Sequence, residues 1–123
     1  MKNDLTKRLF NFAVTVIGVI RKLPRSSEYQ VISYQLSKSA TSSGANYEEA
    51  LAGSSKQDFI YKTEIALREM KESNYWLRII RSIGNEETDM KECCDKLIDE
   101  SSQLSKILAS IVIKAKKGSE GSK

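Results

Sequence analysis

Three carboxylates and two thiols are the side chains of this sequence best suited to chemistry. They are Glu49, Glu69 and Glu72, and the adjacent Cys93 and Cys94. Paired carboxylates can act as acid and base or hold a metal, but the chain contains no histidine. Ser-His and Cys-His dyads and the Glu-x-x-His motif of di-iron bundles are therefore excluded. We predict a protein that is not an enzyme, with no catalytic residue, metal, cofactor or small-molecule substrate.

The two cysteines fit a reduced pair on a helix. Neighbouring residues of a helix point about 100° apart, so Cys93 and Cys94 cannot readily bridge each other. One thiol is expected to face the core, and unbridged thiols are typical of a reducing cytoplasm. The longest apolar run, residues 10–20, is interrupted by Asn11 and Thr15. A span needs about 20 apolar residues, so we expect a soluble cytoplasmic protein without a membrane partner.

The stretch "SATSSGANYEEALAGSS" at residues 39–55 has the composition of a phosphate cradle, a flexible linker or a closely packed helix. It lacks the G-x-x-x-x-G-K-[ST] pattern, and no strand precedes it. It also continues a helical 4-3 spacing that begins upstream. The positions in register are Ile32, Leu36, Ser39, Ser43, Asn46 and Ala50. We predict a helix packed closely through small residues, with Asn46 in a buried hydrogen bond.

Four helices are predicted, over residues 4–23, 27–52, 56–83 and 86–117. The first carries two apolar stripes that together form a wide buried face: Leu5, Leu9, Phe12, Val16, Val19 and Leu23, and beside them Phe10, Ala13, Ile17 and Ile20. Short connections favour antiparallel neighbours. The predicted fold is all-α, an antiparallel up-down-up-down four-helix bundle formed by residues 1–117, followed by a flexible tail over residues 118–123.

Capping signals set the expected helix boundaries. Ser27 with Gln30 matches a capping box, and Ser55 with Asp58 matches another. Gly53 is expected to end the second helix in a left-handed conformation.

The third helix has three opposite-charge pairs at i,i+4 spacing: Asp58 with Lys62, Glu64 with Arg68, and Arg68 with Glu72. Such pairs are common on a solvated face, and they can also lie in a subunit interface.

The sequence resembles the 23S rRNA intervening-sequence proteins, a bacterial family of four-helix bundles. The matching features are "ANYEEA" at residues 45–50, "DF" at 58–59 and "ALREMKESNYWL" at 66–77. The resemblance implies ring-shaped homopentamers without a defined catalytic site. A related protein, the accessory protein of diversity-generating retroelements, forms a basic pentameric barrel that works with a reverse transcriptase and its template RNA. Many relatives carry N-x-x-E-G where this chain reads "NYEEALAG".

The leading functional hypothesis is an oligomeric protein that associates with structured RNA through basic patches. The net charge of +4 allows a modest attraction to phosphate. An up-down bundle would gather its cations at two poles. The candidate nucleic-acid-binding residues are Arg21, Lys22, Arg25, Arg78 and Arg81 at one pole, and Lys114, Lys116 and Lys117 at the other.

The alternative is a structural or protein-binding scaffold without a nucleic-acid role. Aromatic residues are enriched in interfaces, so the tyrosines are candidate anchors. The candidate residues for packing or an oligomer interface are Ser43, Asn46, Tyr47, Glu49, Tyr61, Glu69, Glu72, Tyr75 and Trp76. The expected partners are further copies of the chain. Under the nucleic-acid hypothesis, RNA or a reverse-transcriptase-like protein is a partner as well.

Overall fold

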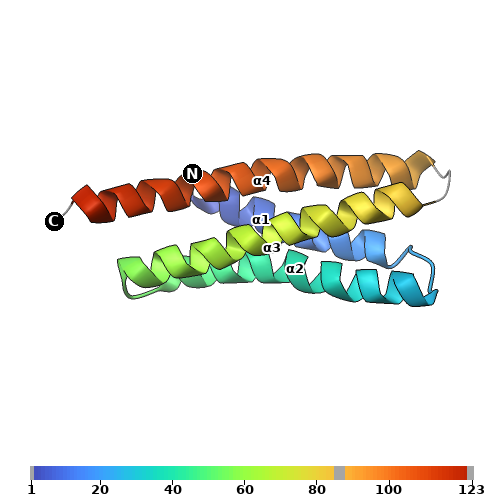
Figure 1. Ribbon diagram of the computed structural model, residues 1–123, viewed down its shortest axis with the longest axis horizontal. Helices are drawn as coiled ribbons and strands as arrows, with labels where there is room; N and C mark the ends of the chain where they lie inside the picture. The colour runs from blue at the N-terminus through green and yellow to red at the C-terminus, as the bar shows by residue number, and fades with distance from the viewer. Residues whose placement is uncertain (1, 85–87, 122–123) are drawn as a thin grey trace.

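The computed structural model describes residues 2–84 and 88–121, and these form four helices. They are α1 (Lys2–Ile20), α2 (Ser27–Ala52), α3 (Lys56–Ile83) and α4 (Thr88–Gly121). Each helix runs antiparallel to the next, which confirms the predicted bundle (Figure 1). The fourth helix continues to Gly121, beyond the expected end at Lys117, and its C-terminal end projects past the turn between α2 and α3 (Figure 1). The expected start at Glu86 lies outside the described residues.

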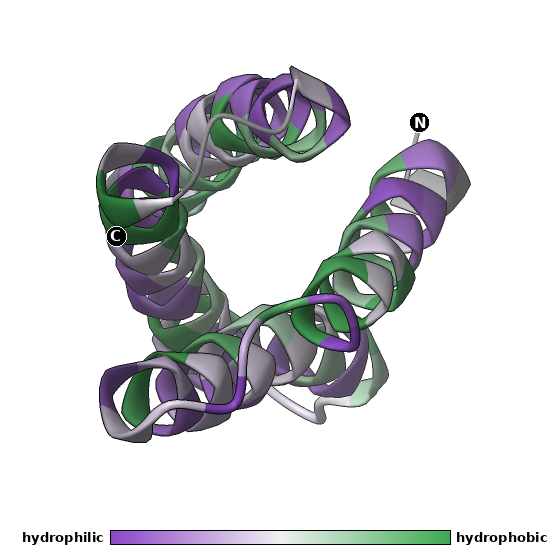
Figure 2. Cartoon of the chain, turned by 90° about the vertical axis from the view of Figure 1, so that its right-hand side faces the viewer, coloured by the Kyte–Doolittle hydropathy of each residue, from purple (hydrophilic) through white to green (hydrophobic). Residues whose placement is uncertain are grey.

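The core is a single apolar cluster to which all four helices contribute. Figure 2 looks along the bundle and shows many of the hydrophobic segments turned toward its centre. Helix α3 packs extensively on both α2 and α4, whereas α1 packs on α2 and approaches α4 less closely. Among the most deeply buried residues of the cluster are Leu9, Val16, Leu36, Ala40, Ala66, Met70, Leu77, Leu104 and Leu108.

The Ser-rich stretch is helical and closely packed, as predicted. Ser39 and Ser73 share a buried hydrogen bond of 2.7 Å between their hydroxyl oxygens. The Ser43 hydroxyl donates to the Ala66 carbonyl at 2.8 Å, so small side chains bring α2 against α3. On the side of α1, a methyl group added at Gly44 would lie 3.3 Å from Cβ of Leu9. Gly44 costs about 1 kcal/mol in helix propensity, and the close approach of α1 accounts for its presence there.

Asn46 does not make the buried contact between helices that the sequence predicts. Its side-chain amide donates to the Ser42 carbonyl of its own helix at 2.9 Å. A partly buried asparagine can satisfy its amide on the preceding turn, which removes the need for a partner on another helix.

The predicted caps are right at one boundary and wrong at two. The Ser55 hydroxyl accepts from the Asp58 amide at 3.0 Å, which confirms the start of α3. Helix α2 has Ser26 as its N-cap, without a side-chain capping bond, and Gln30 donates to the Arg25 carbonyl instead. Gly53 is extended, with φ −67° and ψ 157°, rather than left-handed. The chain leaves α2 in this extended form and reaches the Ser55 cap directly.

Two of the predicted ion pairs within α3 are replaced by pairs between helices. Lys62 pairs with Glu49 of α2 at 2.9 Å, and Glu64 pairs with Lys116 of α4 at 2.8 Å. Both pairs are partly exposed, so solvent screens them and their contribution to stability is small. Arg68 is left without an ion pair in the described part of the chain.

Candidate nucleic-acid interface

The connection between α1 and α2 carries three exposed cations: Arg21, Lys22 and Arg25. Backbone bonds hold the turn, with the Lys22 amide on the Val19 carbonyl at 2.9 Å. No ion pair to the three side chains is found over residues 2–84 and 88–121. The backbone is thus fixed while the three charged groups face solvent, which suits contact with phosphate.

The other two cations proposed for this pole are already engaged. Arg81 Nε lies 2.8 Å from the Asp95 carboxylate of α4. Arg78 donates to the Asn74 side chain at 2.8 Å, and its guanidinium lies 5.6 Å from the centre of the Tyr75 ring. Arg78 remains exposed, but the structure holds both arginines against their own bundle.

An acidic residue lies beside this cluster. Lys22 and Asp89 line the same hollow of about 490 Å³, together with Cys93 and Met90. The hollow reflects the wider spacing between α1 and α4. Gly18 lines it, and a Cβ atom added at Gly18 would have no neighbouring atom within 4 Å. Asp89 reduces the field of Lys22, whereas Arg21 and Arg25 lie outside the residues that line the hollow.

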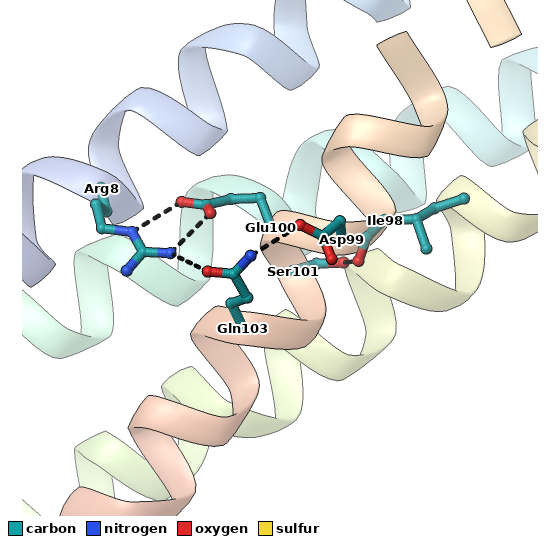
Figure 3. A network of polar contacts seen from close by, with 6 residues as sticks. All are labelled: Arg8, Ile98, Asp99, Glu100, Ser101 and Gln103. Atoms are coloured by element: carbon teal, nitrogen blue, oxygen red, sulfur yellow. Dashed lines mark hydrogen bonds and ion pairs between the residues drawn. The ribbon is translucent and has the colours of Figure 1, made fainter. Parts of the chain in front are cut away.

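The opposite pole is less open than the sequence suggests. Lys114 and Lys117 are exposed, whereas Lys116 is paired with Glu64. Arg8 is also bound, through Nε and Nη2 to the two Glu100 oxygens at 3.0 and 2.7 Å (Figure 3). Nη2 of Arg8 further donates to Gln103 at 3.2 Å, so this cation ties α1 to α4.

The structure divides the proposed packing and interface residues into two groups. Ser43 and Tyr47 are buried within the chain, and burial raises the pKa of the Tyr47 phenol. Trp76 is partly buried and its Nε1 has no hydrogen-bond partner in the described chain. In contrast, Tyr61 and Tyr75 are 60% and 49% exposed. Tyr61 and Tyr75 are therefore available to another molecule, whereas Ser43 and Tyr47 are not.

The three carboxylates do not converge. Glu49 pairs with Lys62, whereas Glu69 and Glu72 lie on α3. Desolvation, followed by the Glu72 charge, raises the pKa of Glu69. The described residues contain no cluster of three metal-ligating side chains. Cys94 is buried, which raises its pKa, and Cys93 is partly exposed.

Helix α1 leaves part of its predicted buried face uncovered. Phe10, from the second stripe, is 61% exposed, and Val14, which belongs to neither predicted stripe, is 53% exposed. With Ile17 of α1 and Gly44 and Ala45 of α2, they line an apolar groove of about 550 Å³. The prediction that both stripes of α1 are buried is therefore wrong for Phe10. The sequence already indicated this exposure, because two adjacent apolar stripes on one helix are wider than a single contact with a neighbouring helix can cover.

Comparison with known proteins places the chain in a family. The family model of the 23S rRNA-intervening sequence protein matches residues 1–110. The chain belongs to this family. The match spans α1, α2, α3 and most of α4, and so includes both the Arg21 turn and the exposed face of α3.

A solved structure agrees with the assignment of this chain to the intervening-sequence family. It is a Bacteroides thetaiotaomicron protein described as having unknown function and belonging to the S23 ribosomal protein family. The identity is 33% and the TM-score 0.76, with 88% of this chain and 97% of the other covered. No curated protein matches the chain. No helix within the described residues is both long and apolar enough to cross a bilayer.

Proposed function

We propose that this intervening-sequence protein is a non-enzymatic, homo-oligomeric bundle that associates with structured RNA through basic patches. The observation that carries the proposal is the exposed, unpaired group Arg21, Lys22 and Arg25 in the described turn. Arginine binds phosphate through two parallel donors, which gives this turn an advantage over the lysines of the other pole. Oligomerisation would multiply the three cations by the number of subunits.

The proposed assembly is a homopentamer, as the family resemblance implies. Contacts in a ring are heterologous, so each subunit must offer two different surfaces. The apolar groove at Phe10 and Val14 is suited to be one of them, because large exposed apolar residues otherwise remain in water. Light scattering that gives only the 13.9 kDa mass of one chain at micromolar concentration would contradict this assembly.

The RNA proposal is tested by charge reversal at the turn. The variant carries Arg21→Glu, Lys22→Glu and Arg25→Glu, and RNA retention is measured in a gel at several salt concentrations. Each lost phosphate contact lowers the magnitude of the slope of log K against log salt by about 0.7 to 0.9, so the slope should fall by roughly 2 to 3. Sequence preference is expected to be weak, because phosphate contacts carry no base information.

A matched control changes the same number of charges elsewhere. Lys38, Lys96 and Lys106 are exposed, are not among the predicted binding residues and lack ion pairs in the described chain, so their replacement by glutamate breaks no pair. A selective loss of RNA in the turn variant supports the proposal. Equal losses indicate binding through total charge alone and contradict a specific role for the turn.

The alternative function is a protein-binding scaffold, which the apolar groove between α1 and α2 favours. Amphipathic helices bind in grooves of this kind through residues spaced three or four apart. If the parent protein retains no RNA even at low salt, the result favours the protein-binding scaffold over the RNA-binding hypothesis. A reverse-transcriptase-like partner, which the family resemblance suggests, belongs to the nucleic-acid hypothesis and not to this alternative.

A further inference from the structure

Helix α3 carries a second heptad stripe on the side opposite its buried face. The buried positions are Thr63, Ala66, Met70, Ser73, Leu77 and Ile80. The outer stripe alternates spacings of four and three residues: Tyr61, Ile65, Arg68, Glu72, Tyr75 and Ile79. An alternation of this kind is the pattern by which one helix packs along another. The bundle core uses the inner stripe. Every residue of the outer stripe is exposed or half-buried, and Ile79 at its end also packs against the core cluster.

The outer stripe is complementary to itself when one copy is reversed. When two copies of α3 lie antiparallel with a two-fold axis passing at Met70, residues of one copy face residues of the other. Tyr61 then lies opposite Ile79, Ile65 opposite Tyr75, and Arg68 opposite Glu72. We propose that α3 packs antiparallel against α3 of a second copy of this chain. The contact is isologous, so each unlike pair occurs twice. A parallel alignment would instead oppose Arg68 to Arg68 and Glu72 to Glu72.

The shape of the surface agrees with this register. A hollow of about 290 Å³ is lined by Tyr61, Glu64, Ile65, Leu67 and Arg68. The register places Tyr75 of the second copy opposite Ile65, at this hollow.

The Tyr75 ring is held in place before any contact forms. It meets the Trp76 ring edge-on, with centroids 5.2 Å apart, and lies under the Arg78 guanidinium at 5.6 Å. An exposed aromatic side chain that is already ordered loses less entropy on binding, which favours its use as an anchor.

The charges at the centre of the stripe are free to pair. Arg68 and Glu72 are both exposed, and neither has an ion pair in residues 2–84 and 88–121. Reversal brings two Arg68–Glu72 pairs together across the axis, one on each side. Opposite charges face each other in this alignment alone, so electrostatics selects the antiparallel orientation.

The flanks limit the strength of the contact. Glu64 approaches Arg78 of the second copy, which is favourable, whereas Glu69 and Lys71 each approach their own counterpart near the axis. Residues 61–79 span about 27 Å of one helix face. An interface of this size belongs to the weak class, which forms at high protein concentration.

This contact deepens the self-association of the proposed function by naming a surface for it. A two-fold contact cannot close a ring of five by itself, so it would join two chains or two rings. It is independent of the RNA-binding turn, which lies on the connection between α1 and α2.

The test uses two single charge reversals, Arg68→Glu and Glu72→Arg, in the full chain. The average mass is measured by light scattering from about 1 μM to about 1 mM, the range in which weak contacts populate. Each variant alone places like charges at both central pairs. We expect its self-association to weaken by at least about tenfold in dissociation constant, equivalent to about 1.4 kcal/mol. Lys106→Glu, on the exposed side of α4, should leave the mass unchanged.

Mixing the two variants in equal amounts provides the decisive result. The chain with Arg68→Glu presents carboxylates at both central positions, and the chain with Glu72→Arg presents guanidinium groups at both. Opposite charges then face each other again in a contact between unlike chains, so the mixture should recover the mass of the parent. A change of helix stability within one chain cannot produce this recovery, and circular dichroism confirms that each variant is folded.

Two outcomes would contradict the α3 contact without contradicting a homo-oligomer. In the first, the parent assembles and the single charge reversals leave its average mass unchanged. In the second, the mixture of the two variants keeps the low average mass of each variant alone. A parent of 13.9 kDa at every concentration overturns both proposals.

Discussion

Replacing Ser43 by leucine tests whether close packing of α2 on α3 holds the bundle together. The side chain is fully buried, and its hydroxyl donates to the Ala66 carbonyl at 2.8 Å. That distance leaves no room for the larger leucine side chain, so the two helices must move apart or the side chain must adopt a strained rotamer. Overpacking of this kind costs about 1 to 3 kcal/mol.

The measurement is thermal unfolding followed by circular dichroism. For a chain of this length, about 1 kcal/mol corresponds to a shift of roughly 3 to 5 °C in Tm, so the expected fall is about 3 to 15 °C. Ser43→Ala is the matched control. It loses one hydrogen bond, a net cost of about 1 kcal/mol, and gains helix propensity, so its Tm should stay within a few degrees of the parent.

An unchanged Tm for Ser43→Leu would refute the reasoning, because a side chain that can be enlarged without cost is not packed between helices. An equal fall for leucine and alanine would assign the effect to the hydrogen bond rather than to volume. Only a larger fall for leucine supports the close approach of α2 and α3.

The remaining predictions concern two charged groups. Arg8→Ala should lower stability by about 1 kcal/mol at low salt, and Arg8→Lys should restore only part of it, because lysine cannot make both bonds to Glu100; chemical unfolding at two salt concentrations measures this. Because the pKa of Glu69 is raised in the fold, the folded state binds more protons than the unfolded state and Glu69 weakens stability as pH rises through its pKa. Glu69→Gln should therefore raise Tm at neutral pH, with a difference that shrinks as the pH is lowered toward the ordinary pKa of a glutamate; a difference independent of pH would contradict burial as its cause.

Sequence periodicity was sufficient to predict the bundle. The 4-3 spacing through Ile32, Leu36, Ser39 and Ser43 predicted a helix in a stretch whose composition resembles a loop. A helical repeat reports on one element, and every turn adds a further position in register, so long helices are predicted well. The same information was too local for the ends of α2, where neither the Ser27 cap nor the left-handed Gly53 was found.

The positions of charged side chains depended on the tertiary structure. From sequence, Lys62 could pair with Asp58 on its own helix, but the fold brings Glu49 of α2 within 2.9 Å. Likewise Arg81 and Lys116 appeared as free cations until packing placed Asp95 and Glu64 beside them. Long charged side chains reach several partners, and only the relative placement of the helices decides which is nearest.

The sequence by itself determined four amphipathic helices, their order and the small-residue seam of α2, because hydrophobic burial follows a period that can be read along the chain. The tertiary structure alone decided which surfaces remain open. It left Phe10 uncovered in a groove, engaged Arg78, Arg81 and Lys116 of the predicted basic poles, and left Arg21, Lys22 and Arg25 in solvent. Exposure depends on how closely α1 approaches its two neighbours, and that spacing results from packing among side chains far apart in the sequence.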